Sequence, residues 1–234
     1  FPMKSTNEAL TLKNRLLTNF ESAYSAESPG ELEEIMNIVV VGGGPTGVEL
    51  SGAIAQMKKF ILPKDYPDLD FSKLNIYLIE GGPNLLGPMS ELAHKKSYEY
   101  LTNMGVNVWT EGRVTDYDGK TISLADGRTI NTRNLIWAAG VMGNVPEGAV
   151  KQEDLQRGNR LKVDRTSKVL GTENIYAIGD ISSMETPKYP HGHPQLARVA
   201  GDQAEQLAKN FDKLGQGLSE EQIKELQKQF ERSE

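Results

Sequence analysis

Cysteine is absent from this sequence of 234 residues. Structural disulfides, thiolate-bound zinc or iron–sulfur centres and redox-active dithiols are therefore excluded within it. Histidine is scarce, with three residues. Two of them, His191 and His193, lie in a loop flanked by prolines, and no third ligand is in view. We therefore expect surface histidines and no metal site.

Long apolar runs and an excess of positive charge are also missing. No apolar run approaches the roughly 20 residues of a membrane-spanning helix. The first residues have neither the basic nor the apolar region of a signal peptide. The formal net charge of −6 gives no electrostatic footprint for nucleic acid. We expect a cytoplasmic chain that binds no nucleic acid.

The most informative stretch is residues 37–56, NIVVVGGGPTGVELSGAIAQ. Its pattern predicts a buried strand, a tight turn and a helix. Gly42, Gly44 and Gly47 match the G-x-G-x-x-G spacing of dinucleotide-binding turns. Pro45 suits the first position of a helix, where its missing N–H would have no partner. A diphosphate would sit at this helix N-terminus, where unpaired N–H groups favour an anion.

A second buried strand is predicted at residues 74–79, and it ends at Glu80. An acid in this place can accept both hydroxyls of an adenosine ribose. Glu80 lies further from the glycines than the usual gap of about 20 residues, and an insertion at residues 58–73 explains the difference. No Lys or Arg occurs between Glu80 and His94. The pattern therefore favours NAD over NADP, whose 2′-phosphate would meet an acid.

The other predicted elements complete an α/β, Rossmann-like NAD-binding domain, with a parallel sheet and an antiparallel hairpin crossover. Asp-Gly pairs at residues 118–119 and 126–127 are typical of hairpin turns. The expected elements are helices at 6–25 and 90–104, strands at 106–109 and 134–138, and three short strands within 113–131.

The C-terminal part is predicted to form a separate unit. Residues 144–160 have the composition of a linker or loop, and residues 174–178 (NIYAI) are predicted to form a strand that ends at Gly179-Asp180. A helix is expected at about 195–210. Ser219 and Gln222 then form a capping pair for a last helix.

Three blocks together resemble the FAD-dependent pyridine nucleotide oxidoreductases. They read VVVGGGPTGVELSGAIAQ (39–56), NLIWAAGVMGN (134–144) and LKVDRTSKVLGTENIYAIGD (161–180). Within that superfamily the sequence is most similar to the type II NADH dehydrogenases, which are NADH:quinone oxidoreductases without proton pumping. The resemblance implies hydride transfer from NADH to FAD and electron transfer on to a quinone.

The resemblance also implies roles for individual residues. Glu49 would lie near the nicotinamide and the flavin, where it would act in positioning or proton handling. Gln195 and Gln203 are candidates for quinone contact, although Arg198 stands where the family has its first glutamine. The residues implied in binding NAD(H) or FAD are Gly42, Gly43, Gly44, Pro45, Thr46, Gly47, Glu80, Gly140, Gly179, Asp180, Gln195, Leu196 and Ala197.

By the same resemblance, the NAD(H) domain at residues 34–143 is inserted in a partial FAD domain. Residues 1–33 and 144–210 would belong to that FAD domain, and 211–234 would form a C-terminal helix. The family places its first FAD loop before the equivalent of Phe1. We therefore expect an internal fragment with an incomplete FAD site, inactive by itself. Its parent would be a peripheral protein on the cytoplasmic face of the inner membrane, with a homodimer as an option.

Other functions stay open on the sequence alone. The chain could be a non-catalytic NAD-binding module, such as a redox sensor or an assembly partner, or a FAD/NAD oxidoreductase with another acceptor. An S-adenosylmethionine methyltransferase is disfavoured by the hairpin crossover.

Overall fold

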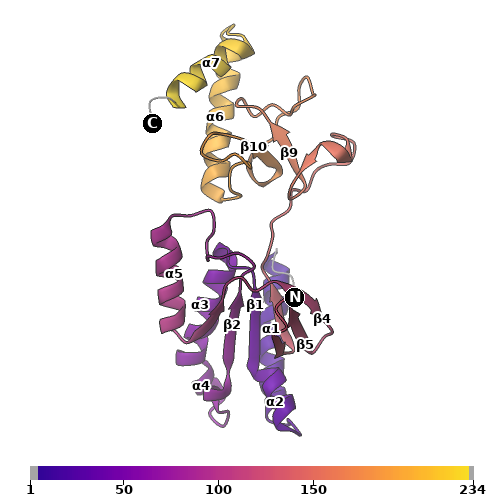
Figure 1. Cartoon of the computed structure of the whole chain (residues 1–234), viewed down its shortest axis with the longest axis vertical. Coiled ribbons are helices and arrows are strands. Elements are labelled where there is room, and N and C mark those ends of the chain that lie inside the picture. Colours follow the sequence, from indigo (N-terminus) through magenta and orange to yellow (C-terminus); the bar gives the residue numbers. More distant parts are fainter. Residues whose placement is uncertain (1–4, 232–234) are drawn as a thin grey trace. The chain divides into compact units, whose positions relative to one another are not determined.

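The structure is a computed structural model that describes residues 5–231, and only the backbone of residues 226–231. The chain divides into two units between Ala139 and Gly140 (Figure 1). Each unit has apolar clusters of its own. This two-way division does not test the four-part domain organisation expected from the sequence, which stays a prediction.

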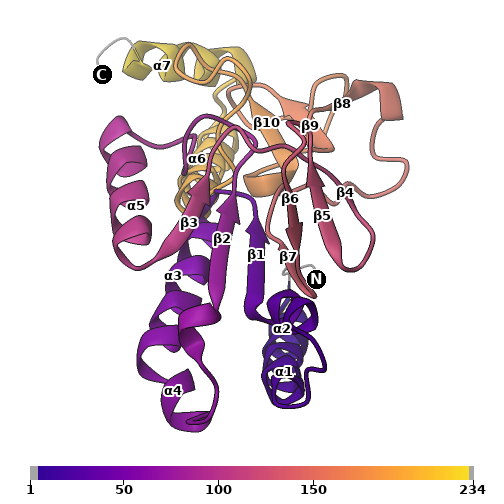
Figure 2. The same ribbon diagram turned by 60° about the horizontal axis from the view of Figure 1, so that its bottom comes forward.

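The first unit is built on a parallel sheet with the strand order β3-β2-β1-β7 (Figure 2). Its strands are β1 (Asn37–Val41), β2 (Asn75–Ile79), β3 (Val106–Trp109) and β7 (Asn134–Trp137). Every residue of β1 is buried, as expected for a central parallel strand covered on both faces. Because β1 and β2 pair in parallel, their carboxyl ends lie side by side, which brings the glycine turn beside Glu80.

Helices cover one face of this sheet. Apolar side chains of α1, such as Leu16 and Phe20, share one cluster with Ile38 of the sheet and Ile54 of α3. The helices are α1 (Thr6–Ala23), α2 (Pro29–Met36), α3 (Pro45–Phe60), the short α4 (Leu62–Asp65) and α5 (Glu91–Asn103), with a 3-10 turn, η1, at Phe71–Lys73. The insertion expected before Glu80 thus extends α3 and adds α4 and η1.

An antiparallel sheet covers the other face. It consists of β4 (Val114–Tyr117), β5 (Thr121–Leu124) and β6 (Thr129–Asn131). Ile122 and Leu124 pack against Val39 and Ile79 of the parallel sheet. The predicted α/β fold with a parallel sheet and an antiparallel crossover is confirmed.

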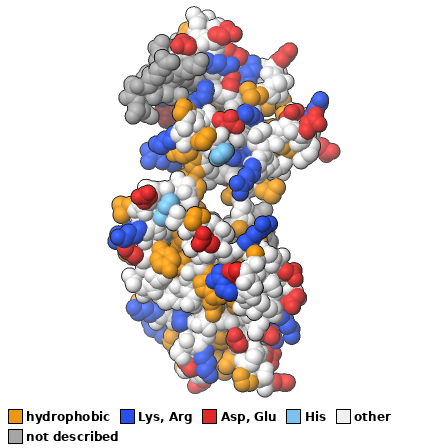
Figure 3. All heavy atoms as spheres, viewed as in Figure 1, with side chains coloured by type: hydrophobic (Ala, Val, Ile, Leu, Met, Phe, Trp, Pro, Cys, Tyr) orange, Lys and Arg blue, Asp and Glu red, His pale blue; other side chains and the backbone are white. Residues whose placement is uncertain are grey.

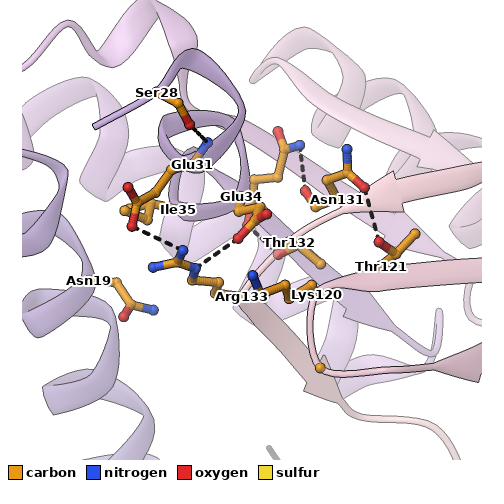
Figure 4. A network of polar contacts seen from close by, with 12 residues as sticks. Asn19, Ser28, Glu31, Glu34, Ile35, Lys120, Thr121, Asn131, Thr132 and Arg133 are labelled. Carbon is orange, nitrogen blue, oxygen red and sulfur yellow. Dashed lines mark hydrogen bonds and ion pairs between the residues drawn. The ribbon is translucent and has the colours of Figure 1, made fainter. Parts of the chain in front are cut away.

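A buried polar network lies at the opposite end of the strands from the glycine turn. The Asn19 amide of α1 donates to Asn134 Oδ1 over 2.5 Å, and the Asn134 amide donates to the carbonyl of Ile35 over 2.8 Å. Arg133 pairs with Glu34 at 2.9 Å (Figure 4). These bonds join α1 and α2 to the start of β7. The segment before residue 34 is therefore part of the first unit, and its assignment to a flavin domain stays a prediction.

The second unit contains a small mixed sheet and two helices. Its strands are β8 (Leu155–Gln156), β9 (Arg160–Val163) and β10 (Ser182–Met184), in the order β10-β9-β8. The 3-10 turns are η2 (Gln152–Asp154) and η3 (Gly179–Ile181), and the helices are α6 (Ala197–Gly215) and α7 (Glu220–Glu231). Ser219 and Gln222 cap α7 reciprocally, as the sequence predicts.

One sequence prediction for this unit is wrong. Residues 174–178 form no strand, because the chain turns back on itself and only Tyr176 makes an isolated bridge, to Lys168. Residues 144–160 are mostly irregular, as the expected linker or loop implies, but they also contain η2 and the first half of the β8–β9 hairpin. Strand β10 lies where the sequence predicts no strand.

Candidate functional site

In the glycine turn between β1 and α3, backbone atoms leave no room for a Cβ at two positions. Gly42 has a φ of +113°, and a Cβ there would lie 2.6 Å from the backbone nitrogen of Ala139. A Cβ on Gly47 would overlap the carbonyl oxygen of Gly42. The first glycine thus permits the turn, and the third permits close packing of α3 against it.

Gly44 is different, because no steric contact requires it. A Cβ on Gly44 would have no heavy atom within 4 Å. Gly44 is the N-cap of α3, it has no side chain to cap the helix, and Pro45 follows it. The next N–H groups, those of Thr46 and Gly47, precede the first intrahelical bonds. The structure therefore combines a helix N-terminus with open space in front of it, which suits an anionic group.

Glu80 lies directly beside this turn. Its Oε2 accepts a hydrogen bond from the Gly43 N–H at 2.6 Å, and its Oε1 accepts one from the Gly82 N–H at 2.7 Å. A carboxylate has about four acceptor positions. Two of them remain for other donors, such as a pair of hydroxyls. Glu80 is partly exposed, so such donors can reach it from solvent.

A second loop, residues 81–90, also holds the glycine turn. The Leu86 N–H donates to the carbonyl of Gly43 over 2.7 Å, and the buried Leu85 packs against Gly43. Leu86 has a φ of +53°, which is uncommon for a residue other than glycine. These contacts join residues more than forty positions apart and have no local sequence signal. The glycines at positions 81 and 82, directly after Glu80, indicate only that the chain turns there.

Three predicted residues lie at exposed positions. Thr46 is exposed in the first turn of α3, and Glu49 is exposed about one turn further on. The Glu49 carboxylate has no side-chain partner among the residues the structure describes. Gly140 is the first residue of the second unit and has a φ of +81°. Each of these groups is accessible to a ligand.

The second unit brings the other predicted site residues together around η3. Gly179 has a φ of +69°, and its N–H donates to Gln203 Oε1 at 2.7 Å. The Gln195 amide donates to the backbone carbonyl of Asp180 at 2.8 Å. Helix α6 begins beside this turn, with Leu196 as its N-cap and Ala197 as its first residue. The structure thus brings together six predicted site residues from two separate stretches of the sequence, 179–180 and 195–203.

Asp180 offers an acceptor to solvent. It is exposed, and its carboxylate has no hydrogen-bond partner in the part of the chain that the structure describes. The first turn of α6 has no acid and no side-chain cap. These features fit a ligand that has hydroxyl groups and a site of partial negative charge.

The histidine loop of the second unit is held by a buried arginine. Arg160 donates to the carbonyls of His193 at 3.0 Å and His191 at 3.1 Å. Burial lowers the pKa of His193, and the nearby charge of Arg165 lowers it further. Within the described residues, no three His, Cys, Asp or Glu side chains cluster as metal ligands would. Nor does any described helix combine the length and apolar character that crossing a membrane requires.

Comparison with known proteins agrees with this geometry. The sequence model of the pyridine nucleotide-disulphide oxidoreductase family matches residues 2–204. The type II NADH:quinone oxidoreductase Ndh of Mycobacterium tuberculosis is 30% identical over 213 residues, which cover 88% of this chain and 45% of that protein. NdhA of the same organism is 32% identical over 220 residues, which cover 90% and 47%.

A solved structure of NDH2 from Plasmodium falciparum in complex with NADH has a TM-score of 0.65 and 28% identity. The match covers 79% of this chain and 40% of that one. The chain spans about half the length of the curated relatives it matches. The resemblance to type II NADH dehydrogenases is confirmed. Because the family model matches most of its residues, this chain belongs to the pyridine nucleotide-disulphide oxidoreductase family.

Proposed function

We propose that this chain forms the NAD(H)-binding part, and a portion of the FAD-binding part, of a flavin-dependent NADH:quinone oxidoreductase. The observation that supports this most strongly is the combination of two groups at the carboxyl ends of β1 and β2. The helix N-terminus at Gly44 faces open space, and the Glu80 carboxylate uses two of its about four acceptor positions within the chain and leaves two for a ligand. The relatives from Mycobacterium tuberculosis are named for this activity.

In this proposal the dinucleotide lies across the glycine turn. The N–H groups of Thr46 and Gly47 bind the diphosphate, and the two free acceptor positions of Glu80 bind the adenosine ribose. A 2′-phosphate would face the Glu80 carboxylate, and no Lys or Arg lies between Glu80 and His94 to compensate. The chain should therefore prefer NADH to NADPH.

The flavin would be bound around η3. The Asp180 carboxylate would accept hydrogen bonds from ribityl hydroxyls, and the start of α6 at Leu196 and Ala197 would favour negative charge on the reduced ring. The redox chemistry belongs to the cofactors, since a nicotinamide gives up a hydride and a flavin passes electrons to a quinone. We assign Glu49 to the surroundings of the nicotinamide, Gly140 to cofactor binding, and Gln195 to the surroundings of the flavin and the quinone.

We further propose that the complete protein is a peripheral membrane protein on the cytoplasmic face of the inner membrane. A lipid-soluble quinone as electron acceptor supports the association with a membrane, and the family resemblance supports the cytoplasmic face. We include a homodimer in this proposal.

Charged side chains of both signs are intermixed on the visible surface of the chain in Figure 3.

Titration of this chain with NADH and NADPH, followed by nicotinamide fluorescence, tests the proposal. We expect NADH to bind at least tenfold more tightly than NADPH. Glu80→Ala should remove most of this preference, because NADPH then meets no acid. Glu91→Ala removes an exposed acid from the first turn of α5 and should leave the preference unchanged. Absence of NADH binding to the wild-type chain would contradict the proposal. So would a preference for NADH over NADPH that is unchanged in Glu80→Ala.

A further inference from the structure

We infer that Gln203 is a positioning residue that fixes the Gly179–Asp180 turn to helix α6. The inference rests on the proposed function only where it concerns FAD. Gln203 is a candidate for quinone contact by sequence resemblance, and the geometry of the second unit points to this different task.

The hydrogen bond to Gly179 determines the orientation of the Gln203 amide. The Gly179 N–H can only donate, so the amide must present its oxygen, and it does so at 2.7 Å. Ser182 Oγ lies 3.1 Å from the same oxygen and 3.0 Å from the carbonyl of Gly179. The Gln203 oxygen thus accepts from the Gly179 N–H of the turn, and it also lies within reach of the Ser182 hydroxyl, whose single proton can go either to it or to the Gly179 carbonyl.

Burial separates Gln203 from potential ligands. Only 6% of its surface is exposed, although it lies on a helix whose neighbouring residues Asp202 and Ala204 are exposed. A quinone could reach the amide only after the turn had moved away from α6. A buried amide that accepts a hydrogen bond from a backbone N–H is typical of a side chain with a structural role.

The turn needs such a fastening because its conformation is unusual. Gly179 has a left-handed φ of +69° and packs closely on α6, where a Cβ would lie 3.2 Å from Ala200 Cβ. Ala200 and Gln203 are three residues apart and therefore lie on the same face of the helix. Gln195, just before the helix, donates a hydrogen bond from its amide to the next carbonyl, that of Asp180.

These contacts link the two groups that the proposed function assigns to FAD. One is the Asp180 carboxylate on the turn, and the other is the N-terminus of α6. The Gln203 amide holds the turn to α6 and so fixes the Asp180 carboxylate relative to the helix N-terminus, as a preorganised site requires. Loss of the amide oxygen should loosen the turn and lower the affinity for FAD, without removing any group that contacts FAD.

Amide hydrogen exchange in the intact chain tests the fastening directly. In the wild-type chain the Gly179 N–H should exchange slowly, although the neighbouring Asp180 is exposed. Gln203→Met keeps a side chain of similar length without the acceptor and should speed exchange of the Gly179 N–H at least tenfold. Gln203→Glu retains an acceptor and should keep it slow. Gln206→Met is the matched control, because the Gln206 amide lies on the same helix and bonds to Asn210.

Fast exchange of the Gly179 N–H in the wild-type chain would overturn the inference, even if every variant failed to fold. Equal exchange in Gln203→Met and in the wild-type chain would also overturn it. A titration with FAD forms the second part of the test. We expect affinity to fall about tenfold in Gln203→Met and to be unchanged in Gln206→Met. If the wild-type chain binds no FAD, as an incomplete FAD site allows, the exchange result by itself decides the role of Gln203.

Discussion

The carboxylate of Glu80 accepts a hydrogen bond from the Gly43 N–H at 2.6 Å. The acid proposed to bind the ribose therefore also holds the loop proposed to bind the diphosphate. One side chain thus links the carboxyl ends of β1 and β2. Substitution of Glu80 should alter both the order of the glycine turn and the choice of dinucleotide.

Glu80→Gln should lower the free energy of unfolding of the first unit by about 1–2 kcal/mol. A glutamine has one oxygen, so its NH₂ group must face either the Gly43 or the Gly82 N–H, and one donor loses its partner. Both tryptophans of the chain, Trp109 and Trp137, lie in the first unit, so tryptophan fluorescence during urea unfolding reports on it. Glu91→Gln is the matched control, with an expected change of a few tenths of a kcal/mol. Equal effects of the two substitutions would contradict the role of Glu80 in the loop.

Alanine at Gly44 and at Gly47 should have opposite consequences. Gly44→Ala meets no atom within 4 Å, so stability should hardly change, while the added methyl group blocks the approach of a diphosphate and weakens NADH binding. Gly47→Ala forces a methyl group against the Gly42 carbonyl and should destabilise the first unit by about 1–3 kcal/mol or more. Urea unfolding and NADH titration of both variants separate the two effects. An unchanged NADH affinity in Gly44→Ala would contradict the proposed position of the diphosphate.

Asn134→Ala should destabilise the first unit by about 1–3 kcal/mol, because it leaves the Asn19 amide and the Ile35 carbonyl buried without their partner. Asn103→Ala removes an exposed asparagine at the end of α5 and should change stability by less than about 0.5 kcal/mol. Tryptophan fluorescence again follows unfolding. If Asn134→Ala is as stable as Asn103→Ala, the network does not fasten α1 and α2 to the sheet.

The second unit should lose stability as the pH falls below about 6.5. Burial and the Arg165 charge hold the pKa of His193 below its ordinary value of 6.5. The unfolded chain therefore binds a proton at a higher pH than the folded chain does, and folding is disfavoured between those two pKa values by at most about 1.4 kcal/mol per pH unit. Thermal unfolding between pH 7.5 and 5 should show this loss in the wild-type chain and less of it in His193→Gln. An NMR titration of His193 with a midpoint above 6.5 would contradict the argument.

The fold of the first unit could be predicted because its signals are local. Uninterrupted β-branched runs mark buried strands, and Asp-Gly pairs mark the hairpins, where Gly119 and Gly127 have φ values of +101° and +87°. The steric need for glycine at Gly42 and Gly47 follows from the G-x-G-x-x-G spacing. In these places the local pattern and the tertiary structure agree.

The second unit was harder to predict, because its order depends on contacts between distant residues. Residues 174–178 have the composition of a strand. The Ala177 N–H nevertheless donates to the carbonyl of Ser167, where the chain folds back on itself, and not to a strand of a sheet. The β8–β9 hairpin could have been found from Gly158-Asn159, which both adopt a positive φ. The bond between Gln203 and Gly179 has no local signal, since it joins a helix to a turn that precedes it by more than twenty residues.

The most direct test of the central claim is to map NADH onto the backbone amides of this chain by NMR. The account predicts that the largest shifts on addition of NADH occur at Gly43, Gly44, Thr46 and Gly47, with further shifts at Gly82, whose N–H shares the Glu80 carboxylate. Binding that leaves these amides unshifted, or no binding at all, would contradict the claim that the glycine turn and Glu80 form a dinucleotide site.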